Sequence, residues 1–260
     1  MNSLKISDIQ PFKMHGNIYF IGSSRVSVHL IDTECGLVLI DTGYPDMYDQ
    51  ILYSMKSLGF NPYDICAIFH SHGHIDHFGC TLKLKELSGA KTYISRIDNE
   101  ITNGTLNLSY ADEIGLEKII FNCDVLVEDG DTYTFGKTSI KCRLTPGHTD
   151  GTLSFFINIP DNDGTITAAM HGGIGTNTLA MNFLNKYNLP FKSRDIFRKG
   201  LHSLYEEHVD LVLGNHPYQN DTVGKLQKIQ SGNSILDIDE WKQLLIYAED
   251  KLDKRIQAES

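Results

Sequence analysis

Short apolar runs separated by turn residues fill the first quarter of the chain. Residues 17–21, 26–31 and 37–40 are rich in β-branched and aromatic side chains, and glycine, serine and proline stand between them. Such runs predict sequential antiparallel strands. Residues 47–58 instead place apolar side chains at a helical spacing, and residues 65–69 form an apolar run typical of a buried strand. The chain therefore continues from strand to helix to strand.

Strands also crowd the middle of the chain, and helices return near its end. Further strands are predicted at residues 92–94, 125–127, 132–135, 139–144, 153–157, 165–169 and 211–213. Further helices are predicted at residues 82–87, 195–207, 223–229 and 239–256. A turn is expected at residues 161–164. Two strand-rich blocks, each with its own helices, predict an α/β protein with two stacked sheets and helices outside. Because no repeat or linker interrupts the pattern, we expect a single domain over residues 1–260.

The charge and composition of the 260-residue chain exclude several classes of protein. With 33 acidic and 23 basic residues the net charge is −10, which disfavours a large interface with nucleic acid. No apolar stretch approaches about 18 residues, and residues 1–8 lack an apolar signal core, so we expect a cytoplasmic protein with no membrane segment. The 5 cysteines are scattered without a C-x-x-C pair, which predicts reduced thiols rather than a cysteine-built zinc site.

Histidines concentrate directly after the apolar run at residues 65–69. Within eight positions this segment holds one aspartate and four of the chain's 11 histidines, namely His70, His72, His74, Asp76 and His77. It lies between a strand and a helix, at the carboxyl end of the strand, where α/β proteins gather ligands. Imidazole nitrogens and carboxylate oxygens are ligands for zinc and similar divalent metals. A metal site is therefore the leading interpretation, and a solvated polar loop is the alternative.

Other residues at strand ends extend this pattern. His148 and His216 each lie in a turn that is marked by glycine and proline and follows an apolar strand. Asp41 directly follows the strand predicted at residues 37–40. A carboxylate in that position can orient a metal ligand by accepting a hydrogen bond from the ligand's other polar atom.

Together these features resemble the metallo-β-lactamase superfamily, most of all the lactamase subclass whose second metal has no cysteine ligand. The resemblance assigns one metal to His72, His74 and His148 and a second metal to Asp76, His77 and His216. It implies two Zn²⁺ ions, with iron or manganese as alternatives. It also implies an αββα sandwich of two mixed β-sheets with helices on both outer faces, in which Asp41 supports the metal loop.

The ligand set and the resemblance predict a metal-dependent hydrolase that acts on a small-molecule substrate. Two ions can share a bridging hydroxide beside a polarised carbonyl, and Asp76 has an oxygen free to orient it as a catalytic residue. We therefore expect the opening of a cyclic amide or lactone, with a β-lactam as the leading substrate. The alternatives are a lactonase or thioesterase of the same superfamily, a phosphodiesterase or RNA-processing nuclease, and a non-catalytic metal-binding protein.

One position departs from the family pattern. Where the resembled lactamases have an aspartate followed by a serine, this chain has His171 followed by two glycines. The change removes a candidate metal bridge and a serine expected to hold a substrate carboxylate. His171 is therefore an additional ligand, a substrate contact or a residue that supports a ligand.

Some further features have alternative roles. Tyr218, close to the last of the assigned ligands, either contacts substrate or is a turn residue. His70 either lines the pocket or faces away from it. Residues 103–117 and 173–190 are candidate specificity loops, and the second is long enough to form a lid. The amphipathic segment at residues 241–252 is expected to pack against the core, with a homodimer contact as the alternative.

Overall fold

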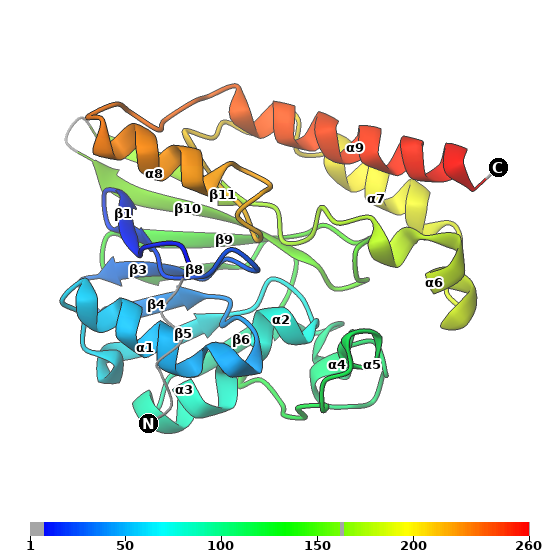
Figure 1. Cartoon of the computed structure of the whole chain (residues 1–260), viewed down its shortest axis with the longest axis horizontal. Helices are drawn as coiled ribbons and strands as arrows, with labels where there is room; N and C mark the ends of the chain where they lie inside the picture. Colours follow the sequence, from blue (N-terminus) through cyan, green and yellow to red (C-terminus); the bar gives the residue numbers. More distant parts are fainter. Residues whose placement is uncertain (1–7, 162–163, 260) are drawn as a thin grey trace.

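Two mixed β-sheets lie face to face, and helices cover both outer surfaces (Figure 1). The computed structural model describes residues 8–161 and 164–259. Within these residues the larger sheet has seven strands, in the spatial order β1 (Phe12–His15), β2 (Ile18–Phe20), β3 (His29–Thr33), β4 (Gly36–Ile40), β5 (Ile65–Phe69), β6 (Lys91–Ser95) and β7 (Val125–Val127). The smaller sheet has five described strands, in the order β12 (Leu211–Leu213), β11 (Gly164–Met170), β10 (Leu153–Asp161), β9 (Thr138–Leu144) and β8 (Thr132–Phe135).

Each sheet combines antiparallel and parallel neighbours. In the larger sheet, strands β1 to β4 pair antiparallel, and β4 to β7 pair parallel. In the smaller sheet, β8 to β11 pair antiparallel, and β12 adds to β11 in parallel. The αββα arrangement of two mixed sheets that the family resemblance implies is confirmed.

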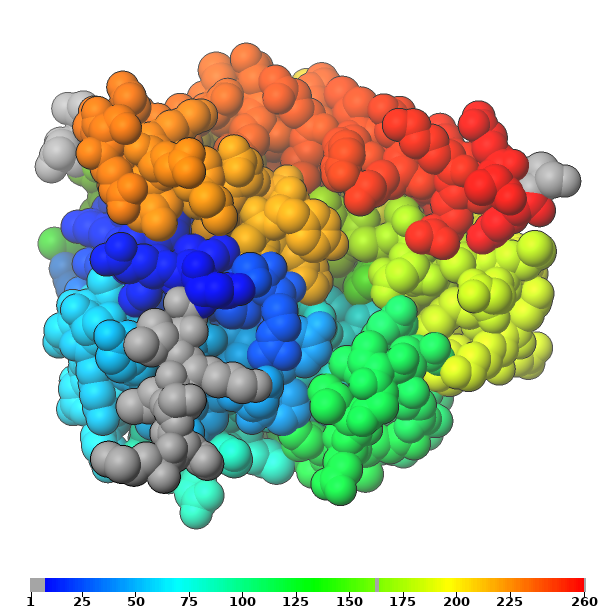
Figure 2. Space-filling model, in the orientation of Figure 1, coloured from blue at the N-terminus to red at the C-terminus, as the bar shows by residue number. Residues whose placement is uncertain are grey.

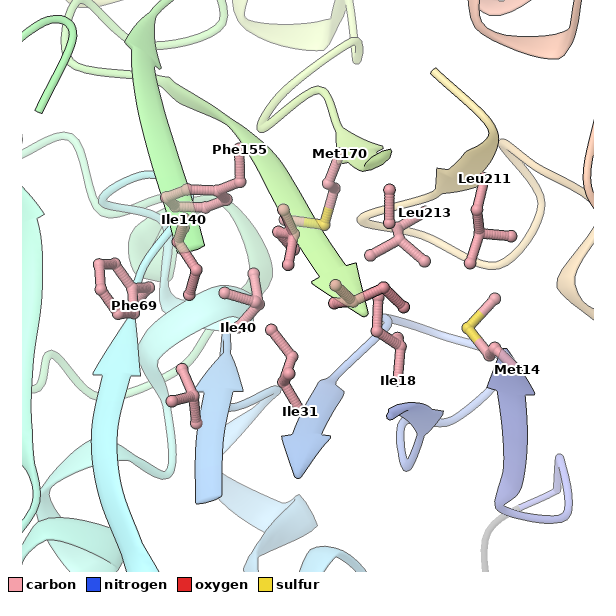
Figure 3. Close-up of a cluster of buried hydrophobic side chains, with 14 of the residues drawn as sticks. Met14, Ile18, Ile31, Ile40, Phe69, Ile140, Phe155, Met170, Leu211 and Leu213 are labelled. Carbon is pink, nitrogen blue, oxygen red and sulfur yellow. The ribbon is translucent and has the colours of Figure 1, made fainter. Parts of the chain in front are cut away.

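The core between the sheets is built by alternate residues of apolar strands. Ile40 and Phe69 point from the larger sheet toward Ile140 and Phe155 of the smaller one (Figure 3). Side chains one position earlier, such as Leu39, point to the opposite face and pack against helices. The apolar runs are therefore continuous because both faces of these strands are buried.

Helices complete the two outer layers. The larger sheet is covered by α1 (Tyr48–Ser57) and α3 (Thr81–Ser88), and the smaller sheet by α7 (Ser193–His202) and α9 (Glu240–Ala258) (Figure 1). The strand β1 contacts α8 (Thr222–Gln230). Shorter helical segments are α2 (Ile75–Phe78), α4 (Asn99–Thr102), α5 (Ala111–Ile114), α6 (Met181–Lys186) and the 3-10 turns Pro45–Met47, Pro62–Asp64 and Asn177–Leu179. No helix in the described part of the chain is long and apolar enough to cross a membrane.

Most predicted elements are present, and the differences have local causes. The strand predicted at residues 26–31 begins only at His29, and the helix predicted at 195–207 ends at His202. The strand β1 and the short helices were not predicted, because segments of three to six residues carry too little periodicity. The expected turn at residues 161–164 includes residues 162–163, which lie outside the described residues, as do residues 1–7 of the amino-terminal segment.

One buried histidine connects the two sheets next to their shared edge. His29 of β3 is fully buried, and its Nε2 lies 3.0 Å from the carbonyl oxygen of Gly214, which follows β12. Since that oxygen can only accept, Nε2 carries the proton. The other ring nitrogen, Nδ1, has no hydrogen-bond partner among the described residues. Burial lowers the pKa of His29 from 6.5 to about 4, because a second proton would create a charge in the core.

This shift predicts a pH-dependent loss of stability. Above pH 6.5 the ring is neutral in both the folded and the unfolded chain. Between pH 6.5 and about 4 the unfolded chain binds a proton that the folded chain excludes, so the free energy of unfolding falls as the pH falls. His29 alone should contribute up to about 3 kcal/mol to this loss.

Urea unfolding across this pH range should show a smaller loss for His29→Gln than for the wild type. The matched control is His208→Gln, because the His208 side chain is 70% exposed. An unchanged pH dependence in His29→Gln would contradict the prediction.

Candidate metal centre

The six predicted ligands come together at one edge of the sandwich, where several strands end. Three elements position them: the segment after β5, the turn between β9 and β10, and the turn after β12. Their ligand atoms form two groups, His72, His74 and His148 in one and Asp76, His77 and His216 in the other, and within each group these atoms lie within 4.8 Å of one another. Residues as far apart in the sequence as His72 and His216, 144 positions, are thus brought to one place.

Hydrogen bonds fix the orientation of the rings in the first group. Ser71 Oγ donates to Asp41, so it accepts from Nδ1 of His72 at 3.0 Å. Nδ1 of His148 lies 2.8 Å from the carbonyl oxygen of Gly175 and therefore donates. Both rings consequently present an Nε2 lone pair to Nδ1 of His74, at 3.0 and 3.1 Å.

This arrangement fits a cation. Nδ1 of His74 can donate its single proton to one of the two lone pairs, which leaves the other unmatched in a buried place. A divalent ion that accepts all three nitrogens removes the mismatch. Three imidazole nitrogens are a ligand set that zinc accepts.

The rings of the second group are also oriented by hydrogen bonds, and this group includes a carboxylate. Nδ1 of His77 donates to Asp41 at 2.7 Å, and Nδ1 of His216 donates to the carbonyl oxygen of Arg25 at 2.8 Å. The two Nε2 atoms face Oδ2 of Asp76, at 3.4 and 3.8 Å. Two nitrogens and one carboxylate oxygen also suit a divalent cation.

The pKa shifts of the rings agree with these roles. Burial, and then the neighbouring histidines, hold the pKa of His72 and of His74 well below 6.5. Burial also lowers the pKa of His148 to about 4. These rings are neutral near pH 7, which is the form that binds a metal. Burial acts in the same direction on His77, but Asp76 and Asp41 outweigh it and raise its pKa, because the two carboxylates favour positive charge at this position.

Asp41 links the two groups. Its Oδ1 accepts from the backbone N–H of Ser71 at 2.7 Å, and its Oδ2 accepts from Ser71 Oγ at 2.8 Å and from His77 Nδ1 at 2.7 Å. The same carboxylate therefore orients His77 directly and His72 through Ser71. Asp41 has a φ of 62°, a conformation that aspartate tolerates better than most residues. The supporting role predicted for Asp41 matches this geometry.

Asp98 joins the segment after β5 to the turn that holds His148. Its fully buried carboxylate accepts from the backbone N–H of Gly73 at 2.7 Å, from Thr149 Oγ1 at 2.6 Å and from the N–H of Gly151 at 2.8 Å. Burial raises the pKa of Asp98 to about 6, and the three donors oppose this shift. The sequence alone does not indicate this role of Asp98, because an aspartate after a short strand has no distinguishing pattern.

Both ligand groups open into one recess of about 330 Å³. In Figure 2, the surfaces of α9 (red), of residues near 215 (gold) and of residues near 110 (green) border a hollow on the viewed face. The two loops predicted to set specificity meet beside it. Tyr110 stacks on Phe183 at 5.8 Å between ring centroids, and Glu113 accepts from Tyr187 at 2.7 Å. The loops are therefore joined to each other.

Three candidates from the sequence lie around the ligand groups without belonging to them. His171 is buried, and its Nδ1 accepts from the backbone N–H of Gly173 at 3.2 Å. His70 uses both ring nitrogens elsewhere, toward Tyr93 O at 2.9 Å and Thr81 Oγ1 at 2.7 Å. Tyr218 is 64% exposed, lines the recess and stacks on the ring of His216.

Glycine next to His171 has a steric reason. A Cβ added to Gly173 would lie 2.8 Å from Cβ and from Cδ2 of His148, and one added to Gly172 would lie 1.9 Å from the carbonyl oxygen of Leu153. Both positions therefore need the absence of a side chain, because the backbone passes directly beneath a ligand ring and a strand end.

Some residues of the recess were not found from the sequence. Tyr44 lines it, and burial, followed by the charge of Asp76, raises the pKa of Tyr44 to about 12, so its hydroxyl remains a proton donor. Lys251 and Arg255 of α9 also line it. A proline directly after Tyr44 and an amphipathic spacing in α9 are ordinary signals, and neither points to a site.

An αββα sandwich with two histidine-rich ligand groups at its strand ends defines a metallohydrolase type of centre. A family model described as the metallo-beta-lactamase superfamily matches residues 21–161, more than half of the chain. The chain therefore belongs to the metallo-β-lactamase superfamily, and the resemblance found in the sequence is confirmed.

Known proteins extend this result. The solved structure of BJP-1, a subclass B3 metallo-β-lactamase of Bradyrhizobium japonicum, has a TM-score of 0.88 and 23% identity, and the match covers 98% of this chain and 96% of that one. MEM-A1, a subclass B3 metallo-β-lactamase from a soil metagenome library, has a TM-score of 0.85 and 25% identity, with 97% of each chain covered. These matches show that the chain has the metallo-β-lactamase fold over nearly its whole length.

Two curated relatives match over shorter lengths. An uncharacterized protein of Aquifex aeolicus is 32% identical over 114 residues, which are 44% of this chain and 50% of that protein. An N-acyl homoserine lactonase of Bacillus cereus is 26% identical over 152 residues, which are 50% of this chain and 56% of the lactonase. The chain thus spans about half the length of these two relatives.

Removing the acceptor capacity of Asp41 should weaken metal binding. In Asp41→Asn an amide N–H₂ must face at least one of the N–H or O–H groups that now donate to the carboxylate. We expect metal affinity to fall about 10- to 100-fold. The free energy of unfolding should fall by about 1–3 kcal/mol. Titration against a competing chelator measures the affinity.

The control for this variant is Asp32→Asn, because Asp32 lies exposed on β3. Both proteins should be compared by chelator titration and by urea unfolding. Wild-type affinity in Asp41→Asn would show that the carboxylate does not position the ligands.

Proposed function

We propose that the protein is a zinc-dependent hydrolase that opens a cyclic amide or a lactone, with a β-lactam as the first substrate to test. One observation carries the proposal: a carboxylate that completes a ligand group also borders the substrate-sized recess. Oδ2 of Asp76 faces the Nε2 atoms of His77 and His216, while the side chain is 14% exposed toward the recess.

The residues around the recess suit attack of water on a carbonyl. Divalent ions held by the two ligand groups would polarise the carbonyl and lower the pKa of a water molecule. Asp76 accepts the proton of the attacking water and returns it to the departing nitrogen or oxygen, so the reaction consumes one water and opens one bond. The phenol of Tyr44 is protonated near pH 7 and can donate a hydrogen bond to the carbonyl oxygen.

A lactone is the second candidate substrate, and similarity to an N-acyl homoserine lactonase supports it. A thioester is also considered, because a hydroxyacylglutathione hydrolase of Maricaulis maris is 33% identical over 116 residues, 45% of this chain and 36% of that protein. Against an RNA substrate stands the net charge of −10, which repels phosphate backbones. A non-catalytic metal-binding role is the remaining alternative, and a measurement of hydrolytic turnover distinguishes it from an enzyme.

Zinc-loaded protein should hydrolyse a chromogenic cephalosporin or an N-acyl homoserine lactone, and chelation should abolish this activity. The variants His72→Ala and His74→Ala should lose at least about 100-fold in kcat/KM, because each removes one ligand of the first group. Zinc content is measured by elemental analysis alongside the rates.

His202→Ala is the matched control, since the His202 side chain is 50% exposed and pairs with Glu249 on a surface helix. It should keep wild-type zinc content and activity. A protein that holds two zinc ions and hydrolyses neither the lactam nor the lactone would overturn the proposed reaction while leaving the metal centre in place.

A further inference from the structure

Two cationic side chains of the last helix line the recess that serves both ligand groups. Lys251 and Arg255 lie four residues apart on α9, so they project from one side of the helix. Both border the recess together with Asp76. Apolar side chains on the buried side of α9 account for its packing against the smaller sheet. This packing does not account for two cations beside the candidate metal centre.

Both cations are held by neutral partners. Nε of Arg255 donates to Oγ1 of Thr176 at 3.1 Å. Nζ of Lys251 lies 4.9 Å from the ring centroid of Tyr247 and 5.8 Å from that of Tyr218. These contacts orient the two side chains, and Arg255 interacts electrostatically with Glu259, whose pKa it helps to lower.

The two cations form no close ion pair with any described residue. Within residues 8–161 and 164–259, neither Lys251 nor Arg255 has a carboxylate oxygen within 4.0 Å. Arg198, by contrast, pairs with Asp253 of the same helix at 2.7 Å. The chain carries an excess of acidic residues, so carboxylates are available for pairing. Two unpaired cations at a recess are therefore a place where a bound anion gains favourable electrostatic energy.

The composition of the rest of the recess wall directs an anionic group toward these two cations. Asp76 is the one carboxylate among the described lining residues, and it belongs to a ligand group. Outside the two ligand groups, the other polar side chains of the wall, including Tyr44 and Tyr110, are neutral side chain types. An anionic substrate group is thus attracted to the α9 side, which leaves the bond to be cleaved near Asp76.

We propose that Lys251 and Arg255 bind a carboxylate of the substrate at a distance from the bond that is cleaved. The inference rests on the proposed hydrolase function. The planar guanidinium of Arg255 can donate two parallel hydrogen bonds to a carboxylate, and Lys251 adds a compact charge. A carboxylate is favoured over a doubly charged phosphate, because the net charge of −10 repels the phosphate more strongly.

The difference from the family pattern next to His171 explains why a carboxylate would need a binding subsite elsewhere in the recess. The resembled lactamases have a serine after the corresponding position, and that serine is expected to hold a substrate carboxylate. Here glycine follows His171, and neighbouring side chains and backbone fill the space around it. A carboxylate-bearing substrate therefore needs donors elsewhere, and α9 supplies them.

The test uses zinc-loaded protein and a mercaptoacyl-proline together with its methyl ester. The thiol anchors both compounds at the metal centre, and esterification removes only the remote carboxylate charge. By titration calorimetry, the acid should bind wild-type protein about 100-fold more tightly than the ester. Lys251→Met and Arg255→Ala should each reduce this ratio about tenfold, and the double variant should bring it close to one. Arg255→Lys should restore part of the loss.

Lys254→Ala is the matched control, because Lys254 is an exposed cation of the same helix outside the recess. It should keep the wild-type ratio of acid to ester affinity. Equal affinities of acid and ester for the wild type, absence of binding by both, or an equal effect of Lys254→Ala would overturn the inference. If the affinity ratio is as expected but no lactam or lactone is hydrolysed, the proposed reaction fails and the anion subsite stands.

Discussion

The site depends on one electrostatic constraint, the placement of several lone pairs opposite one another in a buried location. Nε2 of His72 and of His148 both face Nδ1 of His74, and a carboxylate oxygen of Asp76 completes the neighbouring group. Such an arrangement is unfavourable unless a positive charge lies between the acceptors. The rings of His72, His148, His77 and His216 are each fixed on the far side by a hydrogen bond to an oxygen.

The fold provides this rigidity with buried carboxylates rather than with more ligands. Asp41 ends one strand of the larger sheet and holds residues that follow the next strand. Asp98 connects that segment to the turn between two strands of the smaller sheet. The two sheets are thus joined at the edge where the ligands meet, and the apolar core behind them keeps the strand ends in register.

The sequence predicted the fold class, and local signals together with the family resemblance singled out the six residues that gather in the two groups. Continuous apolar runs predicted strands buried on both faces, and the clustered histidines predicted a metal centre at a strand end. The role of Asp98 and the recess position of Lys251 could not be predicted, because they depend on which loop or helix face folds against the site. Helical spacing showed that α9 has a buried side, and it gave no information about what the opposite side faces.

The last helix packs against the core with one face and borders the recess with another. Leu244, Ala248 and Leu252 repeat every four residues and are buried against the smaller sheet. Tyr247, Lys251 and Arg255 repeat with the same period, three residues further along, and face the recess. Substitutions in the second series leave the first series untouched, so the wall of the recess can change through α9 without repacking the core or altering the candidate metal ligands.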